Sequence, residues 1–526
     1  MLKTVKNSKQ MYVKTALSLM AVELLMFMSV RWIIGQRTEY EWLSKYMVGF
    51  LSYLIGCGGT VLLVFFIMAV RKRLRHEHLF LVLYFALGMA YMVVSPLSSV
   101  PDETEHMLRA YGITIGDFVP PVNDNGEGGS YVPANLTYQW DRSGSRLEYM
   151  VNNIRMEASD DKTFAVYSNT AFYSPLTYVP QAVGMFVTRL VCNRPYVIAY
   201  AGRMCELIAS GILMFYAIKL MPFGKNILLV LSLLPMNMYE CASLSGDGMA
   251  YAVTLLVIAY CLWLRYEKSN TMNRREIVYL YLLLALVASC KIVYAPFVLM
   301  AFIIPVDRFG DRKRYLVHLI CAGVMIFVLA VGWPIGIGSR YLLEFTEGVS
   351  ASKQTVYVLT RPWDFLQIMI NTLMQEGEWL FKTYFAASLS YFSVGCNIVM
   401  VFISFGSLVF VCIMERIYSP EDERNIKWWK RPTVIIGLAT LASIVFTFLS
   451  LYIEWTPYRA SAVTGLQGRY FIPLTFQMAY LIKRKYERDS SEGITSDIGN
   501  GIMPISVISM CMANLMVVVT LLVHFC

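Results

Sequence analysis

Apolar stretches of about twenty residues recur along the whole chain, and they constrain its fold more than any other feature. A helix of about 20 apolar residues is long enough to cross the hydrocarbon core of a bilayer. Candidate spans lie near residues 11–34, 47–70, 79–95, 196–218, 226–244, 248–264, 276–290, 292–306, 315–337, 391–414, 433–453, 466–482 and 502–524. The sequence therefore predicts an all-α polytopic membrane protein with roughly 13 transmembrane helices, several of them short or interrupted by Gly and Pro.

The composition of the 526 residues excludes the main alternative classes of protein. Hydrophobic residues make up 57% of the chain and charged residues only 15%, and the mean hydropathy is +0.53. Soluble domains carry roughly 25% charged residues, so this chain lacks the charge to cover several soluble domains. The same figures exclude disordered, collagen-like and disulfide-rich chains. The cysteines form no Cys-x-x-Cys pair and no Cys/His array, so neither a zinc site nor a disulfide framework is indicated.

Clusters of Lys and Arg between the spans predict the orientation in the membrane. The net charge is +9, and this order of spans places the clusters on one side: 3–9, 71–75, 265–275, 308–314, 416–431 and 483–485. By the positive-inside rule that side is the cytoplasm. The N-terminus would lie there, ahead of a retained first helix rather than a cleaved signal peptide, and the C-terminus outside. No segment alternates basic and aromatic residues as a single-strand binding groove does, so no nucleic acid is expected as a partner.

Two long segments remain on the extracytoplasmic side, and they divide the chain into five parts. We predict helices 1–3 in 1–95, a first extracytoplasmic loop in 96–195, helices 4–9 in 196–337, a second loop in 338–390 and helices 10–13 in 391–526. Within the first loop, 172–190 is amphipathic but too short and too punctuated to span a bilayer. This stretch predicts a juxtamembrane helix that lies in the membrane interface.

The segment Val100–Ala110, directly after the third span, concentrates charged residues. Asp102 and Glu103 suit the positive end of a helix that begins there, and His106 and Arg109 project from neighbouring turns. From spacing alone, a solvated helix start with local ion pairs explains this pattern somewhat better. The functional alternative is a general base, or a carboxylate that binds a metal, at the membrane surface.

Four further polar residues lie within spans or at their ends. Asp247, between two glycines, fits a turn or a site residue. Lys291, between two apolar stretches, is a functional candidate by its depth, or else extends to the interface. Arg469 has the planar charged group suited to phosphate. Arg203, in the fourth span, is a functional candidate or, about equally, forms a buried ion pair with Glu206 at helical spacing.

These residues share one face of the predicted topology. Asp102, Glu103, Asp247, Lys291 and Arg469 all fall on the extracytoplasmic side, although that side was assigned from the Lys/Arg loops alone. If each of these residues had an unrelated structural role, there would be no reason for all of them to lie on the same side. Carboxylates beside fixed cations at a membrane surface indicate a site for an anionic, lipid-linked substrate, in which the cations hold phosphate and a carboxylate acts as base.

Spaced motifs in these segments resemble a bacterial multi-span family catalogued as domain of unknown function 2142, which is grouped with the GT-C glycosyltransferases. The resemblance covers most of the chain. The motifs occur in this order: Pro101-Asp-Glu-x-x-His106, Ser174-Pro-Leu-x-Tyr178-x-Pro180, Tyr200-Ala-Gly-Arg203, Ser243-Leu-Ser-Gly-Asp247, Lys291-Ile-x-Tyr-Ala-Pro296 and Gly468-Arg-Tyr-Phe-Ile-Pro473.

The resemblance implies a GT-C-like membrane glycosyltransferase. Such enzymes transfer a sugar from a polyprenyl-phosphate donor to a glycan or lipid-linked acceptor on the extracytoplasmic side. It further implies that Asp102 or Glu103 is the base or a ligand of a divalent metal (Mg²⁺ or Mn²⁺), with His106 close by. Glu105 is a third carboxylate, so which one is the base stays open. Substrate binding would fall to a set of polar residues: Arg109, Arg203, Asp247, Lys291, Arg469 and Tyr470.

Two other functions fit the same compartment. A flippase or exporter of lipid-linked glycans would also need anion-binding cations, but it should carry charges at the bilayer midplane and inverted repeats, and no repeat is visible here. A polymerase of lipid-diphosphate units would carry Arg-rich outer loops, whereas the second loop has Arg340 and Arg361 only. A purely structural scaffold would not need Lys291 or Arg469.

Overall fold

The computed structural model describes residues 75–137, 146–338, 340–341, 348–391, 393–415, 426–428, 431–487 and 496–525. The expected spans near 11–34 and 47–70, the basic cluster at 3–9 and most of those at 71–75 and 416–431 lie outside these residues. Within the described part the chain is mainly helical, as the sequence predicts. Two small antiparallel sheets of two strands each depart from an all-α fold.

Six helices of the described part are long and apolar enough to cross a membrane. They are α3 (His76–Val94), α8 (Pro195–Leu220), α11 (Asp247–Tyr266), the run Arg312–Gly338, α18 (Pro432–Glu454) and the Ile505–Phe525 part of α20 (Ser496–Phe525). The run Arg312–Gly338 consists of α13 (Arg312–Phe327), a π-helical turn η5 (Val328–Gly332) and α14 (Trp333–Gly338).

Five of the expected spans form helices that are too short to count as full membrane spans or that are interrupted. The expected number of thirteen transmembrane helices is therefore not confirmed. The five spans correspond to α9 (Lys225–Ser232) with α10 (Pro235–Cys241), α12 (Arg274–Cys290), the 3₁₀ helix η3 (Ile292–Ile303), α17 (Ile398–Met414), and the 3₁₀ helix η8 (Gly468–Leu474) with α19 (Thr475–Glu487). Proline explains the short or interrupted helix in three of these spans, since it has no N–H to donate and its ring disturbs an α-helix. Pro235 begins α10, Pro296 lies inside η3 and Pro473 lies inside η8.

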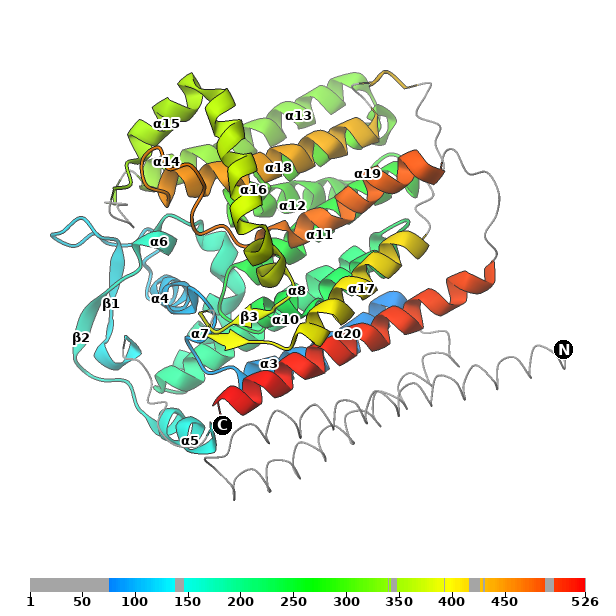
Figure 1. The fold of residues 1–526 in the computed structure, drawn as a ribbon. Coiled ribbons are helices and arrows are strands. Elements are labelled where there is room, and N and C mark those ends of the chain that lie inside the picture. The colour runs from blue at the N-terminus through cyan, green and yellow to red at the C-terminus, as the bar shows by residue number, and fades with distance from the viewer. Residues whose placement is uncertain are drawn as a thin grey trace, which may run out of the picture.

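The two long segments outside the spans form compact elements. The first contains α4 (Glu103–Thr114), β1 (Gly129–Pro133), η1 (Ala134–Leu136), α5 (Arg146–Arg155), β2 (Lys162–Val166), α6 (Ser168–Ala171), η2 (Pro175–Tyr178) and α7 (Val179–Arg189). The second contains α15 (Ala351–Thr360), α16 (Pro362–Tyr384) and β3 (Ser388–Leu389), and β4 (Val394–Gly395) follows it. Figure 1 shows the elements of the first segment gathered at one end of the long helices.

Helix α7 has the amphipathic character that the sequence predicts for 172–190. It packs against α8 and α4. Its free side exposes large apolar side chains at helical spacing, namely Val183, Phe186, Val187 and Leu190. A helix with such a face suits the boundary between headgroups and acyl chains. Its position in the membrane interface stays a prediction.

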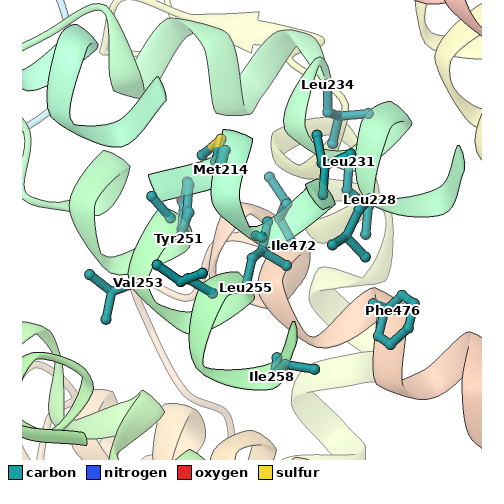
Figure 2. Close-up of a cluster of buried hydrophobic side chains, with 14 of the residues drawn as sticks. Met214, Leu228, Leu231, Leu234, Tyr251, Val253, Leu255, Ile258, Ile472 and Phe476 are labelled. Carbon is teal, nitrogen blue, oxygen red and sulfur yellow. The ribbon is translucent and has the colours of Figure 1, made fainter. Parts of the chain in front are cut away.

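Helix α11 forms the centre of the helical part. In its most apolar window 94% of the residues are buried inside the protein, against 11% for the run Arg312–Gly338. Figure 2 shows side chains of α11 in a buried apolar cluster with residues of α8, α9, η8 and α19, among them Tyr251, Met214, Leu228, Ile472 and Phe476. Because α11 is surrounded on all sides, the residue at its first position, Asp247, is held at the centre of one end.

Two of the basic clusters, 265–275 and 308–314, lie in the described part at the opposite end of the helices from the predicted site residues. Arg265 lies in the last turn of α11 and donates to the carbonyl of Ile303 at 2.6 Å, and the carbonyl of Arg308 accepts from the N–H of Met272 at 2.7 Å. These contacts bring the ends of α11 and η3 together at the start of α12, far along α11 from Asp247. The separation agrees with the expected arrangement, whereas which end is cytoplasmic stays a prediction.

Candidate active site

The motif segments converge at the end of the bundle that carries α4 and α7. Asp102 directly precedes α4, Glu240 lies in the last turn of α10 and Asp247 begins α11. Lys291 joins α12 to η3, and Arg469 lies at the start of η8. The structure therefore brings four of the predicted site residues together with one, Glu240, that was not predicted.

Arg469 lies among three carboxylates. Its guanidinium pairs with Glu240, and its Nη2 and Nε lie 3.6 Å from an oxygen of Asp102 and of Asp247, respectively. Only 4% of the side chain is exposed. Protein carboxylates thus already balance this charge, so Arg469 fixes the relative positions of Asp102, Glu240 and Asp247 rather than presenting a free cation.

Gly468 sets the position of Arg469 through a close approach to α16. Its N–H donates to Thr383 Oγ1 at 2.7 Å, and a Cβ added at this residue would lie 1.8 Å from the carbonyl oxygen of Leu380. We expect Gly468→Ala to lower the free energy of unfolding by about 1–3 kcal/mol, because backbone must move to admit the methyl group. Gly406→Ala, whose Cβ would meet no described atom within 4 Å, is the control. Equal thermal unfolding temperatures for the two variants would refute this packing argument.

Lys291 is more accessible than Arg469. Its Nζ pairs with Asp247 and lies 4.6 Å from the centre of the Tyr470 ring. The Lys291 side chain is 17% exposed and lines a cavity of about 170 Å³, whereas the Asp247 side chain is 2% exposed. An anionic group that enters the cavity would therefore contact Lys291, with Asp247 behind it. Tyr470 lines the same cavity and places its ring face beside both cations.

Asp102 is the most exposed of the three carboxylates around Arg469, with 49% of its side chain accessible. Its backbone has φ 62° and ψ 5°, the left-handed region that is uncommon for a residue with a side chain. The N–H of Asp102 donates to the hydroxyl of Tyr391 at 3.2 Å. Burial raises the pKa of Tyr391 to about 12, so this hydroxyl stays protonated. Strained backbone held by its surroundings, with an accessible carboxylate, is typical of a functional site.

Glu103 and Arg203 form a closed, buried pair. The Nε and Nη2 atoms of Arg203 each donate to one oxygen of Glu103 at 2.7 Å, and both side chains are at most 1% exposed. The remaining Arg203 donors bind the carbonyls of the loop after α3, and Glu103 also accepts from the N–H groups of Ser98 and Leu244. The interpretation of Arg203 as the partner of Glu206 is thus wrong. The pair joins α8 to the start of α4 and has no free donor or oxygen to offer a substrate.

His106 lies one turn after Glu103 and is buried with two tyrosines. Its Nδ1 is 2.7 Å from the hydroxyl of Tyr178, and its ring is parallel to that of Tyr173, with 6.4 Å between ring centres. Burial lowers the pKa of His106 to about 4, against the opposing effect of Asp102 and Asp247. His106 is therefore a neutral imidazole in the neutral range, and its contacts indicate a residue that supports the wall of the site.

The low pKa of His106 predicts how stability depends on pH. Between pH 6.5 and about 4 the unfolded chain binds a proton at this residue that the folded chain does not bind, so stability falls as the pH falls through this window. The contribution is fully retained above pH 6.5, and its loss near pH 4 amounts to roughly 3 kcal/mol. We expect His106→Asn to flatten this part of the profile of unfolding temperature against pH. If the unfolding temperature of His106→Asn falls between pH 6.5 and about 4 as steeply as that of the wild type, His106 is not the group responsible.

Arg109 does not face the cluster. It is fully buried, and its guanidinium donates to the carbonyls of Asp117, Phe118 and Tyr173 at 3.0, 2.9 and 3.2 Å. These contacts connect α4 with the loop that follows it and with the segment before η2. The expected role of Arg109 in substrate binding therefore has no support in its position, because its contacts lie within the segment between α3 and α8.

The side chains present do not fit the divalent metal that the resemblance implies. Within the described residues there is no group of three or more His, Cys, Asp or Glu side chains placed to hold a metal ion. Both oxygens of Glu103 are used by Arg203 and by backbone N–H groups, and the neighbours of Asp102 include the cation Arg469. Magnesium and manganese prefer several oxygen ligands, and this donor set does not supply them.

Glu240 and Tyr391 are the residues of the site that the sequence analysis missed. Glu240 is fully buried and pairs with Arg469. Its position in the sequence could have identified it, because a carboxylate inside an apolar span is a functional candidate by default. Tyr391 had no such signal. It reaches Asp102 from the turn between β3 and β4, a proximity that only the tertiary structure reveals.

Together, the fold and this cluster define a polytopic helical membrane protein with a charged site at one end of its helices. Residues 85–478 match the family described as "Predicted membrane protein (DUF2142)", and the chain belongs to this family. The family resemblance stated from the motifs is thus confirmed.

The chain is similar to a solved structure, the crystal structure of ArnT from Cupriavidus metallidurans bound to undecaprenyl phosphate. The similarity covers 84% of this chain and 77% of that chain, with 14% sequence identity and a TM-score of 0.38. No curated protein matches the chain.

Proposed function

We propose that this protein is a membrane glycosyltransferase. It would transfer a sugar from a polyprenyl-phosphate donor to a hydroxyl of a surface glycan or lipid-linked acceptor, on the extracytoplasmic face of the cell membrane. The observation that carries the proposal is the position of Asp102, an accessible carboxylate on strained backbone that lies against Arg469 and belongs to the same ion-pair network as Lys291. The motif resemblance to GT-C enzymes supports the same reaction class.

Asp102 would act as the general base. Its carboxylate takes the proton of the acceptor hydroxyl, and the acceptor oxygen attacks the anomeric carbon of the donor sugar. The bond from that carbon to the phosphate oxygen breaks, and its electron pair leaves with polyprenyl phosphate. The product is a sugar of inverted anomeric configuration, a protonated Asp102 and a phosphate dianion. Glu105 is less suited, because one of its oxygens is buried without a hydrogen-bond partner in the described structure and is therefore less accessible to an acceptor than the carboxylate of Asp102.

Lys291 would bind the phosphate, since it lines the cavity and is the more accessible of the two cations. It would stabilise the negative charge that develops on the leaving phosphate. Arg469 would act as a positioning residue that orients Asp102 and Asp247. The Glu103–Arg203 pair would hold the loop that carries Asp102.

An apolar groove supports a lipid-linked donor. It has a volume of about 1160 Å³ and runs between α16, α17 and α19. Gly468 and Phe471 of η8 line the groove, and Tyr470 of the same short helix lines the cavity beside Lys291. A polyprenyl chain in the groove would thus leave its phosphate close to Lys291.

A second candidate is an exporter of lipid-linked glycans, and Glu206 favours it. This carboxyl group lies in the middle of α8, is fully buried, and neither oxygen has a hydrogen-bond partner in the described structure. Ionisable residues at such depth recur in proton-coupled transporters.

Mass spectrometry of surface glycans and lipid-linked intermediates, from cells with and without this protein, distinguishes the two candidates. The transferase predicts that one sugar branch disappears and that its polyprenyl-phosphate donor accumulates. Complete glycan units that accumulate on their lipid carrier in the cytoplasmic leaflet would instead establish the exporter.

A further inference from the structure

The cavity beside Lys291 contains polar groups that the proposed reaction does not use. It lies between the end of α12, the turn η5 with α14, and the end of α18. Ser289 lines it from α12, and its hydroxyl is buried without a hydrogen-bond partner in the described structure. Glu454 lines it from the last position of α18, is exposed, and forms no ion pair with a described residue. Buried hydroxyls usually have a partner, and Ser289 places its unpaired hydroxyl beside this cavity.

Aromatic rings form other parts of the wall. Tyr173, Trp333 and Tyr470 line the cavity, and the Trp333 ring is fixed by a hydrogen bond from its Nε1 to the carbonyl of Phe172 at 3.1 Å. Tyr470 is positioned through its backbone carbonyl, which accepts from Tyr294 at 2.9 Å. Rigid aromatic faces combined with a few polar groups suit a ligand with both apolar and hydroxylated surfaces. A sugar ring has this character, with C–H groups on its faces and hydroxyls around its edge.

The size of the cavity excludes the polyprenyl chain of the donor. A volume of about 170 Å³ offers space for on the order of ten water molecules, which suits a single pyranose ring and not a polyprenyl chain. Lys291 lies on the wall, so a phosphate bound there leaves the attached sugar one bond away, inside the cavity.

We infer that this cavity binds the sugar of the lipid-linked donor, with Glu454 and Ser289 as hydrogen-bond partners of its hydroxyls and with Tyr173, Trp333 and Tyr470 against its ring. The inference rests on the proposed function and extends it. It makes Glu454 a determinant of sugar specificity, because a carboxylate can accept hydrogen bonds from two neighbouring hydroxyls only when their orientations match.

Binding of defined lipids to the full-length protein in nanodiscs tests this assignment. The probes are polyprenyl phosphate alone and polyprenyl phosphate that carries glucose, galactose, mannose or arabinose, titrated by native mass spectrometry. We expect the wild type to bind one sugar-bearing lipid more tightly than the bare lipid. Glu454→Gln and Ser289→Ala should each weaken that lipid about tenfold or more and change the affinity for bare polyprenyl phosphate by less than about twofold. Glu157→Gln, on an exposed loop, is the matched control.

The outcomes separate this inference from the proposed function. Lys291→Ala should weaken all the lipids, because it removes the phosphate contact. If the wild type prefers a sugar-bearing lipid and both cavity variants keep that preference, the sugar binds elsewhere and the inference fails, while the proposed function stands. Equal affinity for the bare lipid and every sugar-bearing lipid also overturns the inference. A wild type that binds none of the lipids overturns the proposed function as well.

Discussion

Asp102→Asn is expected to lower the rate of sugar transfer by about 10²–10⁴-fold, the usual contribution of a general base. Asparagine keeps the size of the side chain but cannot accept the proton of the acceptor hydroxyl. The fold should survive, because the Asp102 side chain is half-exposed and its contact with Arg469, at 3.6 Å, is long. Exposed interactions of this kind contribute about 1 kcal/mol or less.

The measurement is the rate of product formation by membranes that contain equal amounts of folded protein. Asp124→Asn, a substitution of an exposed aspartate in the same extramembrane segment, should keep the wild-type rate. Equal rates for Asp102→Asn and Asp124→Asn would show that Asp102 is not the base. In that case Glu105 becomes the next carboxylate to test.

Arg203→Met is expected to destabilise the protein by about 3–5 kcal/mol, because it leaves the Glu103 carboxylate buried without its cation. The Arg203 guanidinium also donates to the carbonyls of Ser95 and Pro96 at 2.8 and 3.0 Å, and these acceptors lose their donor as well. The loss should appear as a large fall in unfolding temperature and in the yield of folded protein.

Two comparisons isolate the buried pair. The double variant Arg203→Met/Glu103→Met should be more stable than Arg203→Met alone, since it removes the orphaned charge. Arg361→Ala breaks an exposed pair with Asp364, whose side chains are 60% and 44% accessible, and should cost about 1 kcal/mol or less. An Arg203→Met protein as stable as Arg361→Ala would mean that the pair does not hold the loop before α4.

The sequence predicts which residues form the site better than it predicts which of them contact each other. Asp102, Asp247, Lys291 and Arg469 could be grouped because each lies at the same end of a predicted span, and a span fixes the depth of its end residues. The apolar pattern does not show which spans are continuous. Proline at 235, 296 and 473 divides or tightens three of them, and the hydropathy of these segments is hardly changed by it.

Arg203 shows why the pairing could not be predicted. Helical spacing favoured Glu206, three residues further along α8. Side chains on a helix lean toward its N-terminus, so Arg203 points to the end of α8 where Glu103 and the loop after α3 lie. Glu103 is remote in sequence, and a contact of this kind depends on the packing of α3, α4 and α8. The same holds for Tyr391, which approaches Asp102 from a separate segment.

A transferase of this kind breaks the bond between a sugar and polyprenyl phosphate. The direct measurement follows a labelled sugar on its polyprenyl-phosphate carrier, in membranes that contain the wild type or the Asp102→Asn variant. The account predicts that label moves from the carrier to a glycan acceptor and that free polyprenyl phosphate appears, in the wild type only. Label that stays bound to the carrier in the wild type, or that moves equally in both, would contradict it.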